Sequence, residues 1–422
     1  MRPAALLVFA ALLALAAITV ARPHSTPGPT MRDFEAYYAA GAARLNGVDP
    51  YGPQLWKFEK SIPGVDATRM ELLPFVGPPA SLPLWSALAR LPYPIAAIVW
   101  GGVLAVAAAA LLWMLLAIFL RASAGAGFAA IVLALGFGPL TSDLALGQIA
   151  LVAIVGVIGG ALCIERRSGA GTFGALAGVT LSAVQPNLAV LNAATAGASL
   201  RRWLLIGASG ATFAGLCMAV VGPAGLAAYA GHLAAHGRAE QDALIQITPR
   251  AVAFGFGASD AAATIVHFAM VVCAIVIWAY AMSAWRGEHW RRRLAFSCAI
   301  LPFAIPFLHE HDLVIEIFAI FFCLSRVAPE RRDPALACAL LVAIDWLGLA
   351  QRPDAAPQAA LLATAFVLAA VWLFPAVRPG SATAGVALLF VACAIFGHVV
   401  PAPVWPDALT GHAHVWSDSA LW

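Results

Sequence analysis

The chain has 422 residues, of which 62% are hydrophobic and 11% charged, with a formal net charge of +3. Its mean hydropathy is +0.88, which is too apolar for a soluble domain of this length, so the chain is an integral membrane protein. The small net charge argues against a nucleic-acid partner. The seven cysteines lie within apolar runs and form no CxxC pair, which indicates small hydrophobic side chains rather than a disulfide frame or a zinc site.

Repeated apolar runs separated by short breaks predict an all-α polytopic membrane protein, because one helix needs about 20 residues to cross the hydrocarbon core. The alternating segments of a β-barrel do not fit such continuous runs. We expect about 11–13 transmembrane helices in a single membrane domain over residues 1–422. The first 21 residues also suit a cleaved signal peptide, but the run is long, and we expect a retained span. The expected spans lie at about 4–21, 94–120, 126–140, 147–164, 170–185, 188–200, 203–222, 261–284, 294–308, 313–326, 335–350, 360–376 and 383–400.

The arginines predict the orientation of these spans. With the N-terminus inside, every arginine cluster falls in a cytoplasmic loop, as the positive-inside rule requires. These clusters are Arg121, Arg166–Arg167, Arg201–Arg202, Arg286 with Arg291–Arg293, Arg326 with Arg331–Arg332, and Arg378. The unusual polar groups then converge on the external face, which has a first loop at 22–93 and a second at 223–260. Polar groups at the mouths of spans indicate a site, although loop ends are also where polar residues ordinarily stand.

The first external loop contains the stretch MRDFEAYYAAGAARLNGVDPYGP. Its apolar positions recur at spacings of three and four, which predicts an amphipathic helix over 33–46 that lies on the external membrane surface. These positions are Phe34, Tyr37, Tyr38, Gly41 and Leu45.

The two ends of this predicted helix carry polar residues with ordinary structural roles. Asn46-Gly47 suits a C-cap, and the Asp-Pro-Tyr-Gly that follows suits a turn. Asp33 has two compatible interpretations, which are an N-cap for the first amides of the helix and a general base held at the membrane surface.

DFEAYYAAGAARLNGVDPY resembles the D-F-x-x-Y-Y-x-A…G-x-x-P-Y signature near the start of glycosyltransferase family 87. Three further segments are similar to landmarks of that family and follow in its order: FVGPPASLPLWSALARLP, LALGQIALVAIVGVI and PFLHEHDLVIEI. The first motif is fairly specific, whereas the other three are short. The resemblance covers about residues 31–325.

The resemblance implies the C-type fold of membrane glycosyltransferases, with an external juxtamembrane helix. It implies an inverting transfer of a sugar, which is mannose or another hexose or pentose, from a polyprenyl-phosphate donor. The acceptor is a hydroxyl of a glycolipid, polysaccharide or protein of the cell envelope, and the active site faces the external, periplasmic side of the inner (plasma) membrane. No cofactor, no metal and no nucleic acid is expected. The alternative is a polytopic transporter or lipid flippase, but neither similar halves nor charges deep within spans are visible.

The family's general base corresponds to Asp33, and a carboxylate suits the removal of a proton from an attacking hydroxyl. The phosphate leaving group needs cationic or hydrogen-bonding partners. His309 and His311 are the first candidates, with Glu310 and Asp312 as supporting carboxylates that orient the imidazoles or raise their pKa values. The alternative interpretation of this LHEHD segment is a charged loop tip.

Other polar residues are candidates for contacts with the donor. Arg250, a rare external arginine in a glycine-rich segment, binds either the donor phosphate or lipid headgroups. Gln148 and Gln185 donate to phosphate or sugar, or else satisfy helix breaks. The family pattern commonly has Lys-Pro where this chain has Gln185-Pro186, so a fixed charge is missing here. Tyr37 and Tyr38 support the site by seating the helix that carries Asp33.

One histidine pair has a spacing that suits a metal. His232 and His236 are four residues apart, and Glu240 follows one turn later. A surface helix explains the same pattern, and we expect no metal there.

Overall fold

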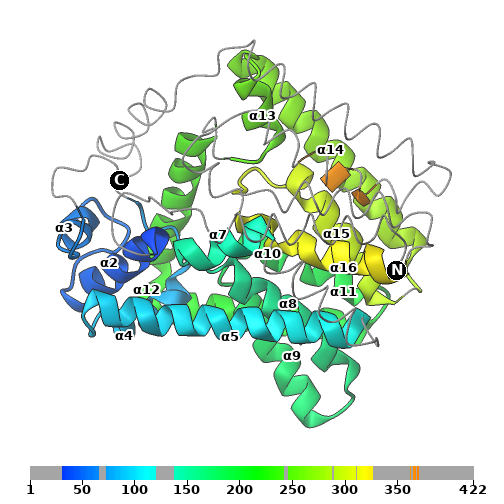
Figure 1. The fold of residues 1–422 in the computed structure, drawn as a ribbon, viewed down its shortest axis with the longest axis horizontal. Helices are drawn as coiled ribbons and strands as arrows, with labels where there is room; N and C mark the ends of the chain where they lie inside the picture. Colours follow the sequence, from blue (N-terminus) through cyan, green and yellow to red (C-terminus); the bar gives the residue numbers. More distant parts are fainter. Residues whose placement is uncertain are drawn as a thin grey trace, which may run out of the picture.

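The computed structural model describes residues 31–65, 73–119, 137–241, 246–287, 289–309 and 311–326, together with 362, 365, 366, 368 and 369. All regular elements within these residues are helices (Figure 1). The expected spans at about 4–21, 335–350 and 383–400 lie outside the described residues, as does Glu310. The expected spans at about 126–140 and 360–376 lie mostly outside them.

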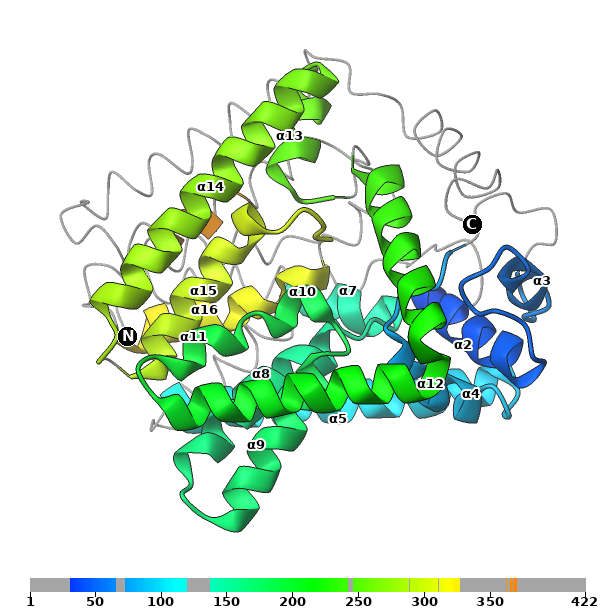
Figure 2. The same cartoon turned by 180° about the vertical axis from the view of Figure 1, so that it is seen from behind.

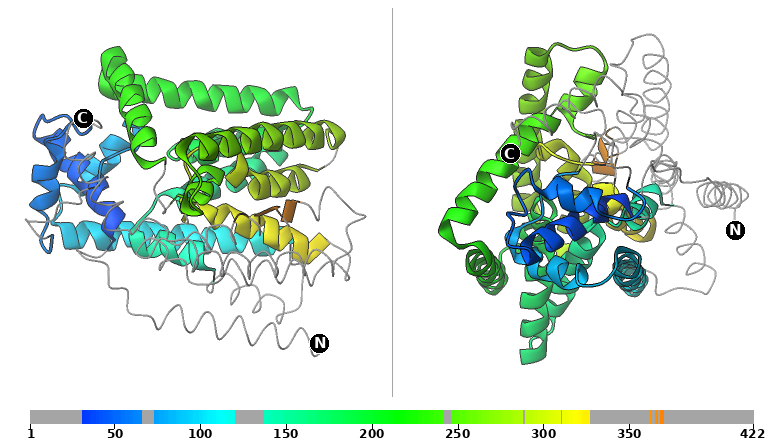
Figure 3. Two further views of the ribbon diagram at one scale, coloured as in Figure 1. Left: turned by 90° about the horizontal axis from the view of Figure 1, so that it is seen from above. Right: turned by 90° about the vertical axis from the view of Figure 1, so that its left-hand side faces the viewer.

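The helices follow one another in this order: α2 (Arg32–Leu45), α3 (Leu55–Lys60), η1 (Pro79–Ser81), α4 (Leu82–Leu88), α5 (Tyr93–Phe119), α7 (Gly138–Leu146), α8 (Ala150–Glu165), α9 (Gly169–Ser182), α10 (Pro186–Ala189), α11 (Asn192–Ala196), α12 (Leu200–Glu240), α13 (Pro249–Gly255), α14 (Asp260–Ala284), α15 (Trp290–Ala304), η2 (His311–Ile315) and α16 (Glu316–Arg326). The elements η1 and η2 are short 3₁₀ helices. Figure 3 shows α2, α3 and α4 gathered at one end of the molecule.

Three described helices, α5, α12 and α14, are long and apolar enough to cross a membrane. The bent pair α7 and α8 makes a fourth candidate if it counts as one span. Large apolar side chains of α5 and α14 point outward, among them Ile98, Val106, Ile265 and Phe268, which is the arrangement expected of a lipid-facing surface. The all-helical membrane fold expected from the sequence is therefore confirmed. The full number of about 11–13 spans stays a prediction.

Helix α12 is broken near its middle. Gly222 has a φ of 70° and a ψ of 178°, which lies outside the helical region, and Pro223 follows it. Proline has no amide hydrogen and its ring clashes with the preceding turn, so the break is located where the sequence predicts it. The first part of α12 runs roughly parallel to α5, and the second part turns sharply toward α13 (Figure 2). The predicted second external loop thus contains the second part of α12 and all of α13.

The second important break separates α7 from α8, whose axes differ in direction by 118°. Gly147 ends α7 in the left-handed region with a φ of 77°. A Cβ at this position would lie 2.9 Å from the Cβ of Phe34 and 3.0 Å from that of Met31. Trp100 fixes the turn by donating from Nε1 to the carbonyl of Gly147 at 2.8 Å. The break therefore places Gln148 directly beside the start of α2.

Helix α2 lies in a cluster of aromatic side chains. Phe34 stacks with Trp100 at a centroid distance of 6.2 Å, and Tyr37 stacks with Trp85 at 4.7 Å. Gly41 permits a close approach to α4, because a Cβ there would lie 2.2 Å from the carbonyl oxygen of Trp85.

The burial of α2 shows that the helix packs within the protein, whereas its position on the membrane surface stays a prediction. The helix buries most of its circumference, including residues outside the predicted apolar positions: Glu35, Ala36, Ala39, Ala40 and Ala43. Leu45, one of the predicted apolar positions, is exposed. The physical reason is that alanines are small enough for other helices to pack closely on the faces that the pattern left unassigned.

The described helices connect two polar ends of the protein. Helix α8 starts next to Gln148 and ends at Glu165, and α15 starts at Trp290 and ends shortly before His309. Trp290 Nε1 donates to Glu165 Oε1 at 2.7 Å, so the far ends of these two helices meet. The candidate active site lies at one end, and three of the arginine clusters lie at the other.

Candidate active site

Asp33 lies in the first turn of α2 and faces the break between α7 and α8. Gln148 Nε2 donates to Asp33 Oδ2 at 2.5 Å, and Tyr37 Oη donates to Gln148 Oε1 at 2.8 Å. Tyr37 thereby fixes the amide with its NH₂ group toward the carboxylate. The N-cap of α2 is Met31, which makes no side-chain capping bond, so the N-cap interpretation of Asp33 is wrong. The aspartate is the second residue of the helix, and its carboxylate binds Gln148 instead.

The environment of Asp33 favours the neutral form of its carboxyl group. Burial raises the pKa of Asp33, and the hydrogen bond from Gln148 partly opposes this effect, as do the charges of Arg32 and His309. The charge of Glu240 raises the same pKa. A carboxylate with a raised pKa is a stronger base than an ordinary aspartate, which suits proton abstraction near neutral pH.

Asp312, at the start of η2, lies on the other side of the centre and is almost completely buried. Its Oδ1 accepts a hydrogen bond from Gln185 Nε2 at 3.0 Å, and its Oδ2 accepts one from the backbone amide of His309 at 3.0 Å. Asn187 Nδ2 lies 3.5 Å from the same Oδ2. Burial raises the pKa of Asp312, and these contacts oppose the shift. Gln185, at the N-terminus of α10, thus donates to the buried carboxylate of Asp312.

His309 is the more accessible of the two candidate histidines, with 18% of its side chain exposed. Its Nε2 lies 2.8 Å from Gln246 Nε2 and 3.3 Å from Glu240 Oε2. Gln246 also donates to Glu240 Oε2 at 3.1 Å and accepts from the amide of Leu308 at 2.9 Å. Glu240 and Gln246 were not predicted as site residues, because they are distant in sequence from the LHEHD segment.

His311 has a different environment from His309. It is buried, its ring packs edge-to-face on that of His309 at 5.3 Å, and its Nε2 lies 3.9 Å from Asp312 Oδ1. Burial and the nearby His309 lower the pKa of His311 well below the usual range for histidine. A neutral imidazole stabilises a phosphate less than a charged one does, so the structure favours His309 over His311 for that task.

Asp143 in α7 is a residue that the sequence analysis did not select. It is fully buried, and neither carboxylate oxygen makes a hydrogen bond of normal geometry within the described part of the chain. The charges of Asp33, Asp143 and Asp312 all act on Tyr37, so the three carboxylates share one region. The signal in the sequence was an aspartate four residues before the Gly-Gln break of an otherwise apolar segment.

Two further predicted residues make contacts away from Asp33. Arg250, in the first turn of α13, is buried and donates to Asp260 and Thr264 of α14. Tyr38 Oη donates to the carbonyl of Leu91 at 2.8 Å, which ties α2 to the chain after α4. These two side chains therefore hold helices in place around the centre.

The histidine pair of α12 takes part in protein contacts. His232 Nε2 lies 3.1 Å from the carbonyl oxygen of Phe75, and His236 Nε2 lies 3.7 Å from Glu240 Oε1. No group of three histidine, cysteine or acidic side chains in the described ranges is arranged to hold a metal.

The helical membrane fold is that of a C-type membrane glycosyltransferase. The model of glycosyltransferase family 87 matches residues 75–307. Because this is more than half of the chain, the protein belongs to glycosyltransferase family 87, as the resemblance predicted. The matched range includes Gln148, Gln185 and Arg250, whereas Asp33 lies 42 residues before its start and His309 two residues after its end. Comparisons with curated proteins and with solved structures gave no match. Membership of this family establishes that the protein is a glycosyltransferase of the membrane bilayer, which acts on a sugar donor and an acceptor.

Proposed function

We propose that this enzyme transfers a sugar from a polyprenyl-phosphate donor to an acceptor hydroxyl, with Asp33 as the general base. The observation that carries the proposal is the buried Asp33 carboxylate, held by Gln148 at a break between two apolar helices. The acceptor hydroxyl gives its proton to an Asp33 oxygen while the hydroxyl oxygen attacks the anomeric carbon. The bond from that carbon to the phosphate oxygen breaks, and its electron pair leaves with the phosphate. Attack from the side opposite the phosphate inverts the anomeric centre.

The departing phosphate gains negative charge and needs a donor aimed at it. His309 fills this role in the proposal, since it is partly exposed and its charge acts on Asp33. Glu240 Oε2, 3.3 Å from Nε2, would pair with the imidazole in its protonated form, which is the form that stabilises phosphate. Gln185 and Asp312 position the segment that carries His309.

An apolar groove supports a lipid-linked donor. It has a volume of about 450 Å³, and its first lining residue, Met31, is two positions before Asp33 in the chain. Its lining is Met31, Pro63, Tyr93, Pro94, Ala97, Ile98 and Gly101. A polyprenyl chain matches such a lining because it buries apolar surface there, whereas a soluble nucleotide sugar has no apolar tail to place in it.

The side of the membrane on which the Asp33 centre lies is proposed from the arginines at the opposite end of the protein. Arginine clusters at the far ends of α8, α12 and α15 support a cytoplasmic location for those ends under the positive-inside rule. The Asp33 centre then faces the external, periplasmic side of the inner (plasma) membrane. The donor sugar is mannose or another hexose or pentose, and the acceptor is a glycolipid, polysaccharide or protein of the cell envelope.

The test is sugar transfer by the purified full-length protein in nanodiscs, with radiolabelled polyprenyl-phosphate mannose and pentose donors and a membrane extract as acceptor. Replacing Asp33 by asparagine is expected to lower the transfer rate by about 10²- to 10⁴-fold, the usual contribution of a general base. Asp49→Asn is the matched control, because Asp49 is exposed in the same loop and only caps a turn through the amide of Tyr51 at 3.0 Å.

Three outcomes would contradict the proposal. Unimpaired transfer by the Asp33 variant overturns the assignment of the base. Absence of transfer by the wild type from every polyprenyl-phosphate donor overturns the donor class. Lipid movement across the bilayer without any sugar transfer favours the flippase alternative.

A further inference from the structure

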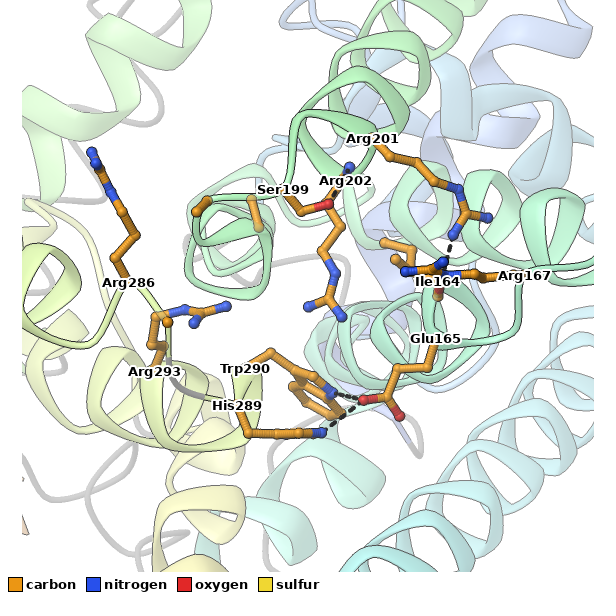
Figure 4. A pocket seen from close by; sticks show the side chains of 13 residues that line it. Ile164, Glu165, Arg167, Ser199, Arg201, Arg202, Arg286, His289, Trp290 and Arg293 are labelled. Atoms are coloured by element: carbon orange, nitrogen blue, oxygen red, sulfur yellow. Dashed lines mark hydrogen bonds and ion pairs between the residues drawn. The ribbon is translucent and has the colours of Figure 1, made fainter.

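A second cavity lies at the opposite end of the helices from Asp33. It has a volume of about 750 Å³ and opens where α8 ends and where α12 and α15 begin (Figure 4). Its charged or ionisable lining residues are Glu165, Arg167, Arg201, Arg202, Arg286, His289 and Arg293. None of these residues belongs to the candidate active site.

The lining carries a large excess of positive charge. Five arginines and one glutamate line the cavity, which gives a formal charge of +4 when His289 is neutral. Glu165 is already engaged, because its Oε1 accepts from Trp290 Nε1 at 2.7 Å and lies 2.9 Å from His289 Nε2. Gathering guanidinium groups in one hollow is unfavourable unless an anion compensates them.

The arginines at the centre are held in fixed positions. Figure 4 shows Arg202 and Arg293 reaching toward the middle of the cavity from different helices. Arg293 is 2% exposed, and its Nε donates to the carbonyl of Ala194 at 2.9 Å. An Nη1 atom of Arg202 donates to the carbonyl of Thr195 at 2.6 Å. Side chains fixed in this way lose little further freedom when they bind an anion.

Two long helices also direct their N-termini toward the cavity. Helix α12 starts after Ser199, whose Oγ accepts from the amide of Arg202 at 3.4 Å, and α15 starts after His289. The first amides of a helix and its dipole attract negative charge. The arginines and the helix ends therefore favour the same kind of ligand, which is a group bearing phosphate.

The surface beside the cavity is apolar. Leu200 and Leu204, in the first turn of the candidate span α12, are 71% and 64% exposed, and Trp203 is exposed between them. Such side chains face the hydrocarbon of a bilayer, whereas a site for a soluble anion has no need of them. A ligand with a phosphate head and acyl chains matches both parts of the surface.

We propose that this cavity binds the phosphate headgroup of an anionic phospholipid, with the acyl chains along the first turns of α12. The positive-inside rule explains the presence of these arginines but does not require five of them to converge on one hollow. The proposal is independent of the donor and acceptor assigned to the Asp33 centre.

The experiment is native mass spectrometry of the full-length protein from a mild detergent, after addition of phosphatidylglycerol or phosphatidylcholine. The double variant Arg167→Gln with Arg286→Gln removes two exposed lining charges. Retention of phosphatidylglycerol is expected to fall by about tenfold or more, since each arginine near lipid phosphate contributes appreciably to binding. Arg166→Gln is the matched control, because Arg166 is an exposed neighbour that does not line the cavity.

Several results would overturn the proposal. Equal retention of both lipids by the wild type shows that the headgroup charge is not recognised. Equal losses in the double variant and in Arg166→Gln assign the effect to general surface charge. Displacement of the lipid by millimolar inorganic phosphate identifies a free phosphate as the ligand instead. If the double variant is unfolded, Arg286→Gln alone, in the exposed turn before α15, serves as the test.

Discussion

Replacing Gln148 by leucine tests whether its hydrogen bond controls the basicity of Asp33. The amide donates to the carboxylate at 2.5 Å and thereby stabilises the charged form. A hydrogen bond to a charged group contributes about 1.5–3 kcal/mol, and one pKa unit corresponds to about 1.4 kcal/mol. Loss of this donor is therefore expected to raise the pKa of Asp33 further.

The raised pKa of Asp33 in the Gln148→Leu variant moves the pH dependence of sugar transfer. A base acts only when deprotonated, so transfer is lost as the pH falls through the pKa of Asp33, and in the variant this loss occurs at higher pH. The assay is kcat/KM against pH, with the acidic limb expected to move to higher pH. Asn46→Leu is the control, because Asn46 Nδ2 donates to the carbonyl of Ala42 at the other end of α2, at 2.8 Å, and its loss is not expected to move that limb.

A readout that needs no turnover complements the kinetics. The infrared carboxyl band of Asp33, identified by subtraction of the Asp33→Asn spectrum, reports protonation in both the wild type and the Gln148 variant. An acidic limb and a carboxyl titration that both stay at their wild-type pH would refute the role assigned to Gln148.

Three further changes test the surroundings of Asp33. Gly147→Ala forces an L residue into the left-handed region at a cost of about 1–2 kcal/mol, and its Cβ clashes with α2. It is therefore expected to lower both the unfolding temperature and the rate of sugar transfer. Gly102→Ala, where a Cβ meets nothing within 4 Å, is the control and should lower neither. Tyr37→Phe removes a neutral hydrogen bond of about 0.5–1.5 kcal/mol, so kcat/KM is expected to fall by up to about tenfold, and an unchanged rate would show that the amide of Gln148 needs no support. Asp143→Leu removes a buried carboxyl group whose oxygens make no hydrogen bond of normal geometry among the described residues and is expected to stabilise the protein by about 1–3 kcal/mol, the cost of an unsatisfied buried polar group. A lower unfolding temperature in thermal denaturation would contradict this.

The sequence predicted individual polar residues better than their partners. Asp33 and Gln148 each stood out, one after an apolar run and one at a break, but they are 115 positions apart. Their pairing depends on the left-handed turn at Gly147 and on the hydrogen bond from Trp100, which no local pattern specifies. The composition and apolar runs were sufficient for the helical membrane fold, because the length of a span depends on the bilayer and not on neighbouring helices.

Errors arose where tertiary packing decided the outcome. The N-cap interpretation of Asp33 relied on the local preference of aspartate, whereas Gln148 provided a partner from elsewhere in the chain. The spacing of the large residues of α2 gave no weight to its alanines, which are buried in the folded chain. Glu240 was considered only with His232 and His236, because the bend of α12 that brings it to His309 is a property of the folded chain.

The Gly222–Pro223 break has a consequence for the depth at which the chemistry takes place. A straight helix of 41 residues would be about 60 Å long, twice the thickness of the hydrocarbon core. Glu240 at its end would then stand roughly 30 Å out in the water. The part before Gly222 measures about 33 Å, which is enough for one crossing. Because the chain turns at that point, Glu240 instead lies 3.3 Å from His309 Nε2, beside the centre at which the proposed lipid-linked donor would react.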